Sequence, residues 1–190
     1  MVVRNVPCDE ILVLCEGWAA SCLTLPDGRR QILAFLLPGD FLSPASLVRD
    51  NVGFSSLAVT DIQVSIFSRS AIRARLEHDA HLAGALHDCL ADKLTEVDRL
   101  LAVVAQRSAE ERVAYLVLHL TGRLKTRRPS SDDRYFFPLR QQDMAEALGL
   151  TSVHVSRVMT SFRTRGWLRL DNGVLEIANR LELERLGRLE

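Results

Sequence analysis

A segment without carboxylates stands out in this chain. Between Gly149 and Leu170 there is no Asp or Glu, although the whole chain carries 24 basic and 24 acidic residues. The segment is instead rich in Ser, Thr and Arg. Hydroxyl groups donate hydrogen bonds, and the planar guanidinium of Arg binds phosphate oxygens or base edges through two parallel N–H groups. This composition indicates a surface that binds a polyanion.

Two short helices are expected to position these groups. Apolar residues recur at helical spacing from Gln141 to about Leu148, and again after Thr151 to about Arg165. Gly149 suits the left-handed backbone that ends a helix, and Thr151 is a favourable N-cap for the next one. The side chains expected to face inward are Met144, Ala145 and Leu148, then Val155, Val158, Met159 and Phe162.

A β-hairpin is expected after the second helix. The segment WLRLDNGVLEI places Asp171-Asn172-Gly173 between two short apolar strands, and Asn-Gly is a strong signal for a tight turn. Helix, turn, helix and β-ribbon together predict a winged helix-turn-helix. Such a motif places its second helix in the DNA major groove, which is about 12 Å wide.

The outward side chains of the second helix suit that role. They are small, hydroxyl-bearing or basic, and a carboxylate among them would be repelled by phosphates. The residues expected to reach bases or the adjoining backbone are Thr151, Ser152, Val153, His154, Ser156 and Arg157. The residues expected to lie near the phosphate backbone are Arg163, Arg165 and Arg169. A helix-turn-helix that serves only for packing is the alternative.

Charge is divided unevenly along the chain. Residues 1–107 hold 10 basic and 13 acidic side chains, whereas residues 108–190 hold 14 and 11. The predicted helix-turn-helix therefore lies in the basic half. This placement, the hairpin and the missing acids together favour DNA binding over simple packing.

A long amphipathic helix is expected from about Asp79 to Arg107. Side chains that are apolar except for His87 recur seven residues apart in two rows, as in the seam of a coiled coil. One row contains His87, Leu94 and Leu101, and the other contains Leu90, Val97 and Val104. The pattern predicts a homodimer joined through Leu90, Leu94, Val97, Leu101 and Val104. Packing of this helix on its own domain is the alternative.

Short strands are expected before this helix. Residues 10–67 combine β-tolerant apolar runs with turn signals at Pro26-Asp27-Gly28 and in LPGDF, which is typical of a small roll or barrel. Ser108 and Glu111 form a capping box that begins a new helix. The predicted fold class is α+β. It has a partial β-roll or jelly-roll sensor domain over residues 1–78, a dimerisation helix over 79–107 and a winged helix-turn-helix domain over 108–190.

Catalysis, metal binding and membrane insertion are not indicated. No nucleophile–base pair or phosphate loop is evident. Cys8, Cys15, Cys22 and Cys89 form no C-x-x-C pair. Cys15 and Cys22 are interpreted as small apolar fillers in strands, and a metal or iron–sulfur site is the alternative. No apolar run approaches the roughly 20 residues of a membrane helix, and the start is a poor signal peptide, so a cytoplasmic location is expected.

The chain resembles the CRP/FNR family of transcription regulators, the relatives of the cyclic AMP receptor protein. The resemblance rests on LVLCEGWAASCLTLPDGRRQILAFLLPGDFL, on the long helix and on LRQQDMAEALGLTSVHVSRVMTSFRTRGWL. It implies a homodimer that binds double-stranded promoter DNA and contacts RNA polymerase. By position, Arg157 matches the family's guanine-reading Arg, whereas Val153 stands where many members have a Glu that reads cytosine.

The departures from the family pattern concern the ligand and the N-terminus. Members that bind cyclic AMP carry a Glu for the ribose and an Arg for the cyclic phosphate. Here Pro44 and Phe54 stand at those positions, and loss of the charge-assisted pair argues against cyclic nucleotide binding. The cysteines do not reproduce the tight N-terminal cluster of the oxygen-sensing branch. The family's first strands are not found before Glu10, which favours a start codon placed too late over a shortened roll.

The sequence therefore predicts a regulator that is not an enzyme, needs no cofactor and binds a palindromic promoter site as a homodimer without cyclic AMP. A regulator gated by a small molecule in the β-roll is the alternative. The effector, the operator and the direction of regulation stay open.

Overall fold

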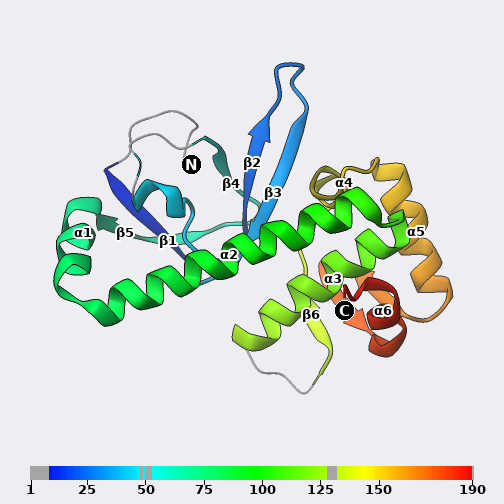
Figure 1. The fold of residues 1–190 in the computed structure, drawn as a ribbon. Helices are drawn as coiled ribbons and strands as arrows, with labels where there is room; N and C mark the ends of the chain where they lie inside the picture. The colour runs from blue at the N-terminus through cyan, green and yellow to red at the C-terminus, as the bar shows by residue number, and fades with distance from the viewer. Residues whose placement is uncertain (1–8, 48, 50–52, 128–131, 190) are drawn as a thin grey trace. The chain divides into compact units, whose positions relative to one another are not determined.

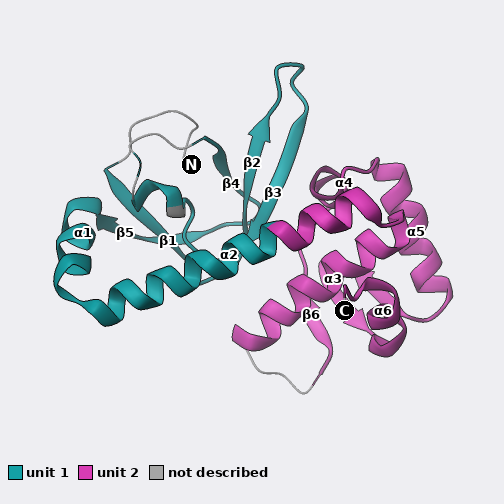
Figure 2. Cartoon of the chain, in the orientation of Figure 1, with its two compact units in different colours: residues 1–97 teal, residues 98–190 magenta. Residues whose placement is uncertain are grey.

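The computed structural model describes residues 9–47, 49, 53–127 and 132–189. The chain divides into two compact units, residues 1–97 and 98–190, and the boundary falls inside the long helix α2 (Ala80–Gln106) (Figure 2). α2 matches the predicted extent of the dimerisation helix, and it contributes residues to both units. Within the described ranges, no helix is long and apolar enough to span a membrane.

The strands of the first unit form two small antiparallel sheets (Figure 1). One sheet pairs β1 (Glu10–Glu16) with β5 (Gln63–Ser68). In the other, β2 (Ala19–Thr24) lies between β3 (Arg30–Leu36) and β4 (Ser55–Ala58).

The turn between β2 and β3 lies where the sequence predicts it. Gly28 has φ +83°, and its N–H donates to the carbonyl oxygen of Leu25 at 2.9 Å. Asp27 accepts from the backbone N–H of Arg29 at 3.0 Å. Only a residue without Cβ takes this left-handed backbone readily, so Gly28 fixes the turn.

Side chains that alternate along these strands build the core of the first unit. Leu14, Ala19, Leu36 and Leu42 form its centre, and each is at most 4% exposed. Gly17 lies close to a neighbouring loop, since a Cβ built on it would lie 2.1 Å from the carbonyl oxygen of Asp61. This approach lets the turn between β1 and β2 close over the core.

The cysteines of the first unit have different environments. Cys22 is buried in β2, as predicted. Cys15 is exposed, and its Sγ lies 3.0 Å from the Oγ atom of Ser65. The interpretation of Cys15 as a buried filler is wrong, because strand alternation turns it to the face opposite Leu14. Cys8 lies outside the described residues.

Two Arg side chains tie helix α1 (Arg69–His78) to the segment around η1 (Pro44–Leu47), a short 3₁₀ turn. Arg69 donates to the carbonyl oxygen of Arg49 at 3.0 Å, and Arg73 donates to that of Leu47 at 2.8 Å. Because Arg69 is only 9% exposed, these contacts fix the start of α1 against the roll.

The second unit contains the end of α2, further helices and a small sheet. Its helices are α3 (Ala109–Arg127), α4 (Gln141–Leu148), α5 (Ser152–Thr164) and α6 (Arg180–Gly187). Its strands, in sheet order, are β6 (Arg134–Phe136), β8 (Val174–Ile177) and β7 (Leu168–Asp171). The capping box predicted at the start of α3 is present, because Ser108 and Glu111 exchange two hydrogen bonds of 2.8 and 3.4 Å.

Candidate nucleic-acid interface

The turn between α4 and α5 has the geometry that its sequence indicates. Gly149 has φ +63°, and the N–H of Leu150 donates to the carbonyl oxygen of Ala145 at 3.0 Å. The hydroxyl of Thr151 accepts from the N–H of His154 at 3.2 Å and so caps α5. The predicted ends of both helices are therefore confirmed to within one residue.

Apolar packing holds the two helices in one orientation. All of the residues predicted to face inward are buried: Met144, Ala145, Leu148, Val155, Val158, Met159 and Phe162. Polar groups complete the arrangement. Asp143, at 4% exposure, accepts from the backbone N–H of Arg140 at 3.0 Å. Arg112 of α3 donates to the carbonyl oxygen of Leu148 at 3.1 Å, which satisfies the end of α4.

The outer face of α5 consists of the residues predicted to contact bases. Val153, His154 and Arg157 are exposed, whereas Ser152 and Ser156 are half-buried. Val153 and Arg157 lie one turn apart, and Thr160 and Thr164 continue the same row at helical spacing. Arg157 forms no ion pair with any described residue. Its guanidinium is thus available to a ligand in front of this face.

The three predicted phosphate-contacting arginines differ in their surroundings. Arg163 is exposed and has no ion pair within the described parts of the chain. Arg165 donates two hydrogen bonds, of 3.1 and 3.2 Å, to the carboxylate of Glu110 in α3. Arg169 donates to Asp171 at 3.1 Å. The segment without acids in sequence is therefore not free of acids in space, because α3 brings Glu110 to it. Sequence reasoning missed Glu110, which is 55 residues from Arg165.

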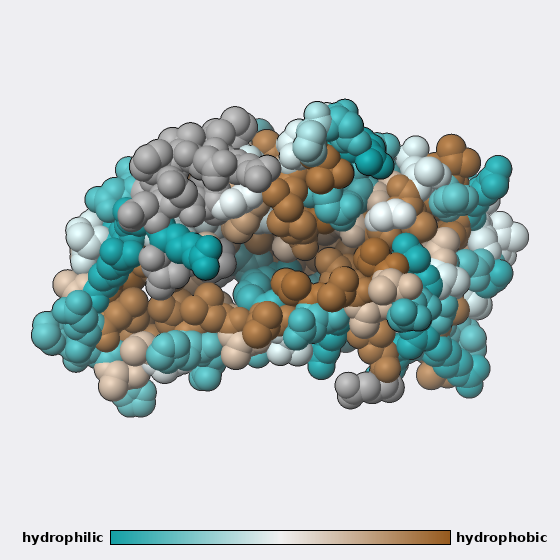
Figure 3. All heavy atoms as spheres, turned by 45° about the horizontal axis from the view of Figure 1, so that its top comes forward, coloured by the Kyte–Doolittle hydropathy of each residue, from teal (hydrophilic) through white to brown (hydrophobic). Residues whose placement is uncertain are grey.

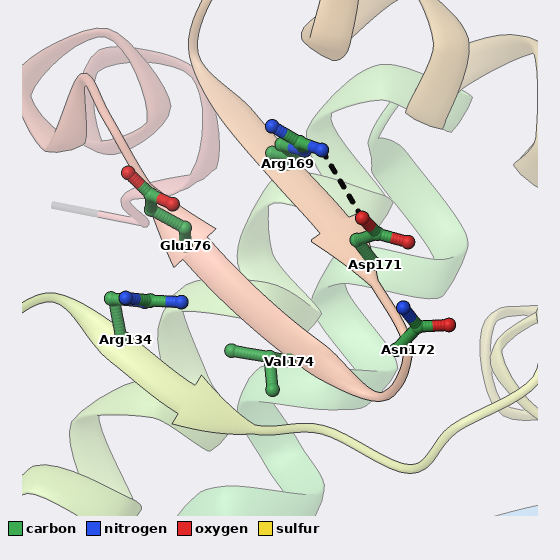
Figure 4. A pocket seen from close by; sticks show the side chains of 6 residues that line it. All are labelled: Arg134, Arg169, Asp171, Asn172, Val174 and Glu176. Atoms are coloured by element: carbon green, nitrogen blue, oxygen red, sulfur yellow. Dashed lines mark hydrogen bonds and ion pairs between the residues drawn. The ribbon is translucent and has the colours of Figure 1, made fainter.

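The wing, which is the hairpin of β7 and β8, presents a surface of mixed charge. A shallow pocket on its sheet is lined by Arg134, Arg169, Asp171, Asn172, Val174 and Glu176 (Figure 4). In the strand register Glu176 faces both Arg134 and Arg169. The positive charges of the wing are thus partly compensated within the sheet itself, in contrast to the outer face of α5.

Hydrophobic side chains follow the length of α2 (Figure 3). The predicted seam residues Leu90, Leu94, Val97 and Leu101 are 37%, 64%, 56% and 67% exposed. Val104 differs, because it is half-buried and one of its methyl carbons lies 3.6 Å from a Cβ built on Gly149. Four of the five predicted seam residues thus form an exposed apolar stripe, and the fifth packs against the turn between α4 and α5.

The roll contains buried polar groups near the two positions that depart from the cyclic-nucleotide pattern. Pro44 begins η1, and Phe54 is half-buried just before β4. Ser56 donates to the carbonyl oxygen of Leu42 at 2.8 Å. The hydroxyl of Ser43 is buried and has no hydrogen-bond partner among the described residues. Nowhere in the described ranges do three or more His, Cys, Asp or Glu side chains gather as ligands for a metal ion.

Comparisons with known proteins cover both units. A model of Crp-like helix-turn-helix domains matches residues 111–186, and a model of cyclic nucleotide-binding domains matches residues 2–79. The nitrogen fixation regulation protein FixK of Bradyrhizobium diazoefficiens is 32% identical over 172 residues, which cover 90% of this chain and 71% of FixK. The solved structure of FixK2 from Bradyrhizobium japonicum superposes with a TM-score of 0.88 at 26% identity, covering 100% of this chain and 93% of that one.

The name of a third relative mentions a ligand. The CRP-like cAMP-activated global transcriptional regulator of Mycobacterium tuberculosis is 25% identical over 183 residues, which cover 96% of this chain and 81% of the relative. For four further relatives, the chain spans only 62–66% of their length.

These matches define the class of protein and then the family. The class is a regulator with a β-roll domain and a DNA-binding helix-turn-helix, so the α+β fold predicted from the sequence is confirmed. The chain belongs to the CRP/FNR family of transcription regulators.

Proposed function

We propose that this regulator binds a palindromic promoter site as a homodimer, with α5 of each copy in the major groove. The observation that carries the proposal is the outer face of α5, where Arg157 is exposed and unpaired among the described residues. Arg157 is placed to bind a guanine through two N–H groups, and Val153 is placed to pack on a thymine methyl. Thr151, Ser152, His154 and Ser156 surround them, and Arg163 and Arg169 contact phosphates.

The exposed stripe of α2 supports the homodimer. Leu94 and Leu101 are more than 60% exposed, and apolar side chains at heptad spacing are stable when a second helix covers them. A two-fold axis along paired α2 helices presents two copies of α5 to half-sites about one helical turn apart, roughly 34 Å. A palindromic operator follows from this symmetry.

Independence from cyclic AMP is supported by the two altered positions. Phe54 offers no positive charge to a cyclic phosphate, and Pro44 offers no carboxylate to a ribose. The named cAMP-activated relative is therefore a guide to the fold and not to the effector of this chain.

A regulator gated by another small molecule is the second candidate. The buried hydroxyl of Ser43, without a partner among the described residues, supports it, because a buried polar group is stabilised when it gains a hydrogen bond. Such a ligand would act by favouring one arrangement of the dimer over another. We propose further that the regulator contacts RNA polymerase and acts in the cytoplasm, where the promoter lies.

The test is a selection of genomic DNA fragments by the full chain, with and without cyclic AMP at about 0.1 mM, a large excess over micromolar affinity. Arg157→Ala is the matched control. We expect a palindrome to be enriched equally in both conditions, and the control to lose part of that enrichment. Enrichment only with the nucleotide would contradict independence from cyclic AMP. Enrichment of no sequence would contradict the proposed function.

A further inference from the structure

Arg165 and Glu110 form a bidentate ion pair at the C-terminal end of α5. The two terminal nitrogens of Arg165 donate to the two carboxylate oxygens of Glu110 at 3.1 and 3.2 Å. Ser161 donates to the same carboxylate at 3.3 Å. The guanidinium of Arg165 also lies 4.9 Å from the ring centre of Trp167. These contacts hold the cation in one place.

The pair lies at the edge of the proposed DNA-binding face. Along α5, His154, Ser161 and Arg165 follow one another at spacings of seven and four residues, so they share one flank of the helix. This flank adjoins the row of Val153, Arg157 and Thr160. Glu110 of α3 thus places a carboxylate at the edge of the outer face of α5, which carries no carboxylate itself.

The pair contributes little to holding α5 in place. The side chains of Arg165 and Glu110 are 45% and 36% exposed, and ion pairs at this exposure are weakened by water and salt. Val158 and Phe162, at 7% and 0% exposure, already anchor the same part of the helix in the core. Loss of this ion pair should therefore leave the fold of α5 intact.

We infer that Glu110 pairs with Arg165 and thereby lowers the affinity of the regulator for DNA of any sequence. Binding to DNA of any sequence depends almost entirely on cations that meet phosphates. While Arg165 is paired with Glu110 it adds little to this attraction, and the carboxylate repels a phosphate that approaches the flank. Glu110 therefore weakens binding to operator and non-operator DNA by a similar factor. The inference rests on the proposed function.

The test compares four variants of the full chain on two duplexes of equal length, one carrying the selected operator and one a scrambled sequence. Glu110→Gln should bind both duplexes about three- to tenfold more tightly at about 0.1 M salt. Its plot of log affinity against log salt should steepen by about one, the value of one added phosphate contact. Arg165→Gln and the double variant Glu110→Gln/Arg165→Gln should show neither change.

Glu182→Gln is the fourth variant and the matched control. Glu182 pairs with Arg185 at 2.8 Å on α6, and its side chain is 32% exposed, close to the value for Glu110. The Glu182→Gln variant loses one negative charge, as Glu110→Gln does, but its freed partner is Arg185 and not Arg165. It should therefore bind DNA like the wild type. Arg165→Gln breaks the same ion pair as Glu110→Gln, and comparing their thermal unfolding separates a folding defect from a binding effect.

The outcomes separate the inference from the proposed function. If the wild type binds neither duplex preferentially, the proposed function fails. If the wild type prefers the operator but Glu110→Gln binds the scrambled duplex no more tightly, the inference alone fails. The inference fails as well if the double variant binds as tightly as Glu110→Gln, because Arg165 would then have no part in the effect.

Discussion

Gly187 of α6 and Ala114 of α3 meet at their backbones. A Cβ built on Gly187 would lie 2.8 Å from the carbonyl carbon of Ala114 and 2.8 Å from the backbone nitrogen of Tyr115. This close approach seats α6 on α3, the helix that also carries Glu110 and Arg112. The absence of a side chain at position 187 thus sets how closely α6 packs on α3.

Gly187→Ala should therefore destabilise the protein by about 1–3 kcal/mol, because the added methyl must push rigid backbone atoms apart. Thermal unfolding of the variant and the wild type measures the loss. Gly122→Ala is the control, since Gly122 lies exposed in α3 and a Cβ there meets no other atom within 4 Å. That change should stabilise the protein by up to about 1 kcal/mol. Equal effects of the two substitutions would contradict the packing argument.

Acid should destabilise the junction between α2 and α3. Hydrogen bonds from Ser108, followed by the ion pair with Arg107, lower the pKa of Glu111 from 4.5 to about 2. A carboxylate whose pKa is lower in the folded state stabilises the fold fully above about pH 4.5 and loses this contribution as the pH falls towards 2. Glu111→Gln should lower stability at pH 7 by about 1 kcal/mol. Below pH 4.5, the unfolding midpoint of the variant should also fall less steeply with pH than that of the wild type. An equally steep fall in both proteins would contradict this assignment.

Leu94→Glu should prevent dimerisation without unfolding the chain. Leu94 is 64% exposed, so a carboxylate costs little in one copy, whereas two copies would bury like charges across the seam. The dimer dissociation constant should rise at least about a hundredfold, as expected for the loss of one buried Leu from each copy. Sedimentation equilibrium measures this. Thr95→Glu, at the neighbouring outward position of α2, should leave the dimer intact. If both substitutions weaken dimerisation equally, the predicted seam is wrong.

Arg157 and Arg163 should differ in how their loss affects DNA binding. Arg157→Ala should cost about 1–3 kcal/mol on the operator and relax the preference at one base pair of each half-site. Arg163→Ala should weaken operator and scrambled DNA alike and reduce the salt slope by about one. Titrations of both variants on a set of single-base operator changes distinguish these results. An equal loss on every sequence for Arg157→Ala would contradict its role in reading a base.

Features that depend on near neighbours in the chain follow from the sequence alone. Gly149 and Thr151 set the turn between α4 and α5, because capping bonds join residues only three to five positions apart. The wing turn is equally local, with φ +48° at Asn172 and +73° at Gly173, as the Asp-Asn-Gly signal predicts. The inward and outward faces of α5 follow from its 3.6-residue period.

Features that join distant segments were decided only by the tertiary structure. Glu110 reaches Arg165 across 55 residues, and no local pattern connects an acid at the start of α3 with the end of α5. Val104 fits the heptad pattern of α2, yet the packing of the second unit half-buries it against Gly149. Periodicity specifies which side of a helix is apolar, but not which partner covers it. The sequence alone therefore determines α5 and its outward face, whereas the fold determines which charges beside that face are already paired.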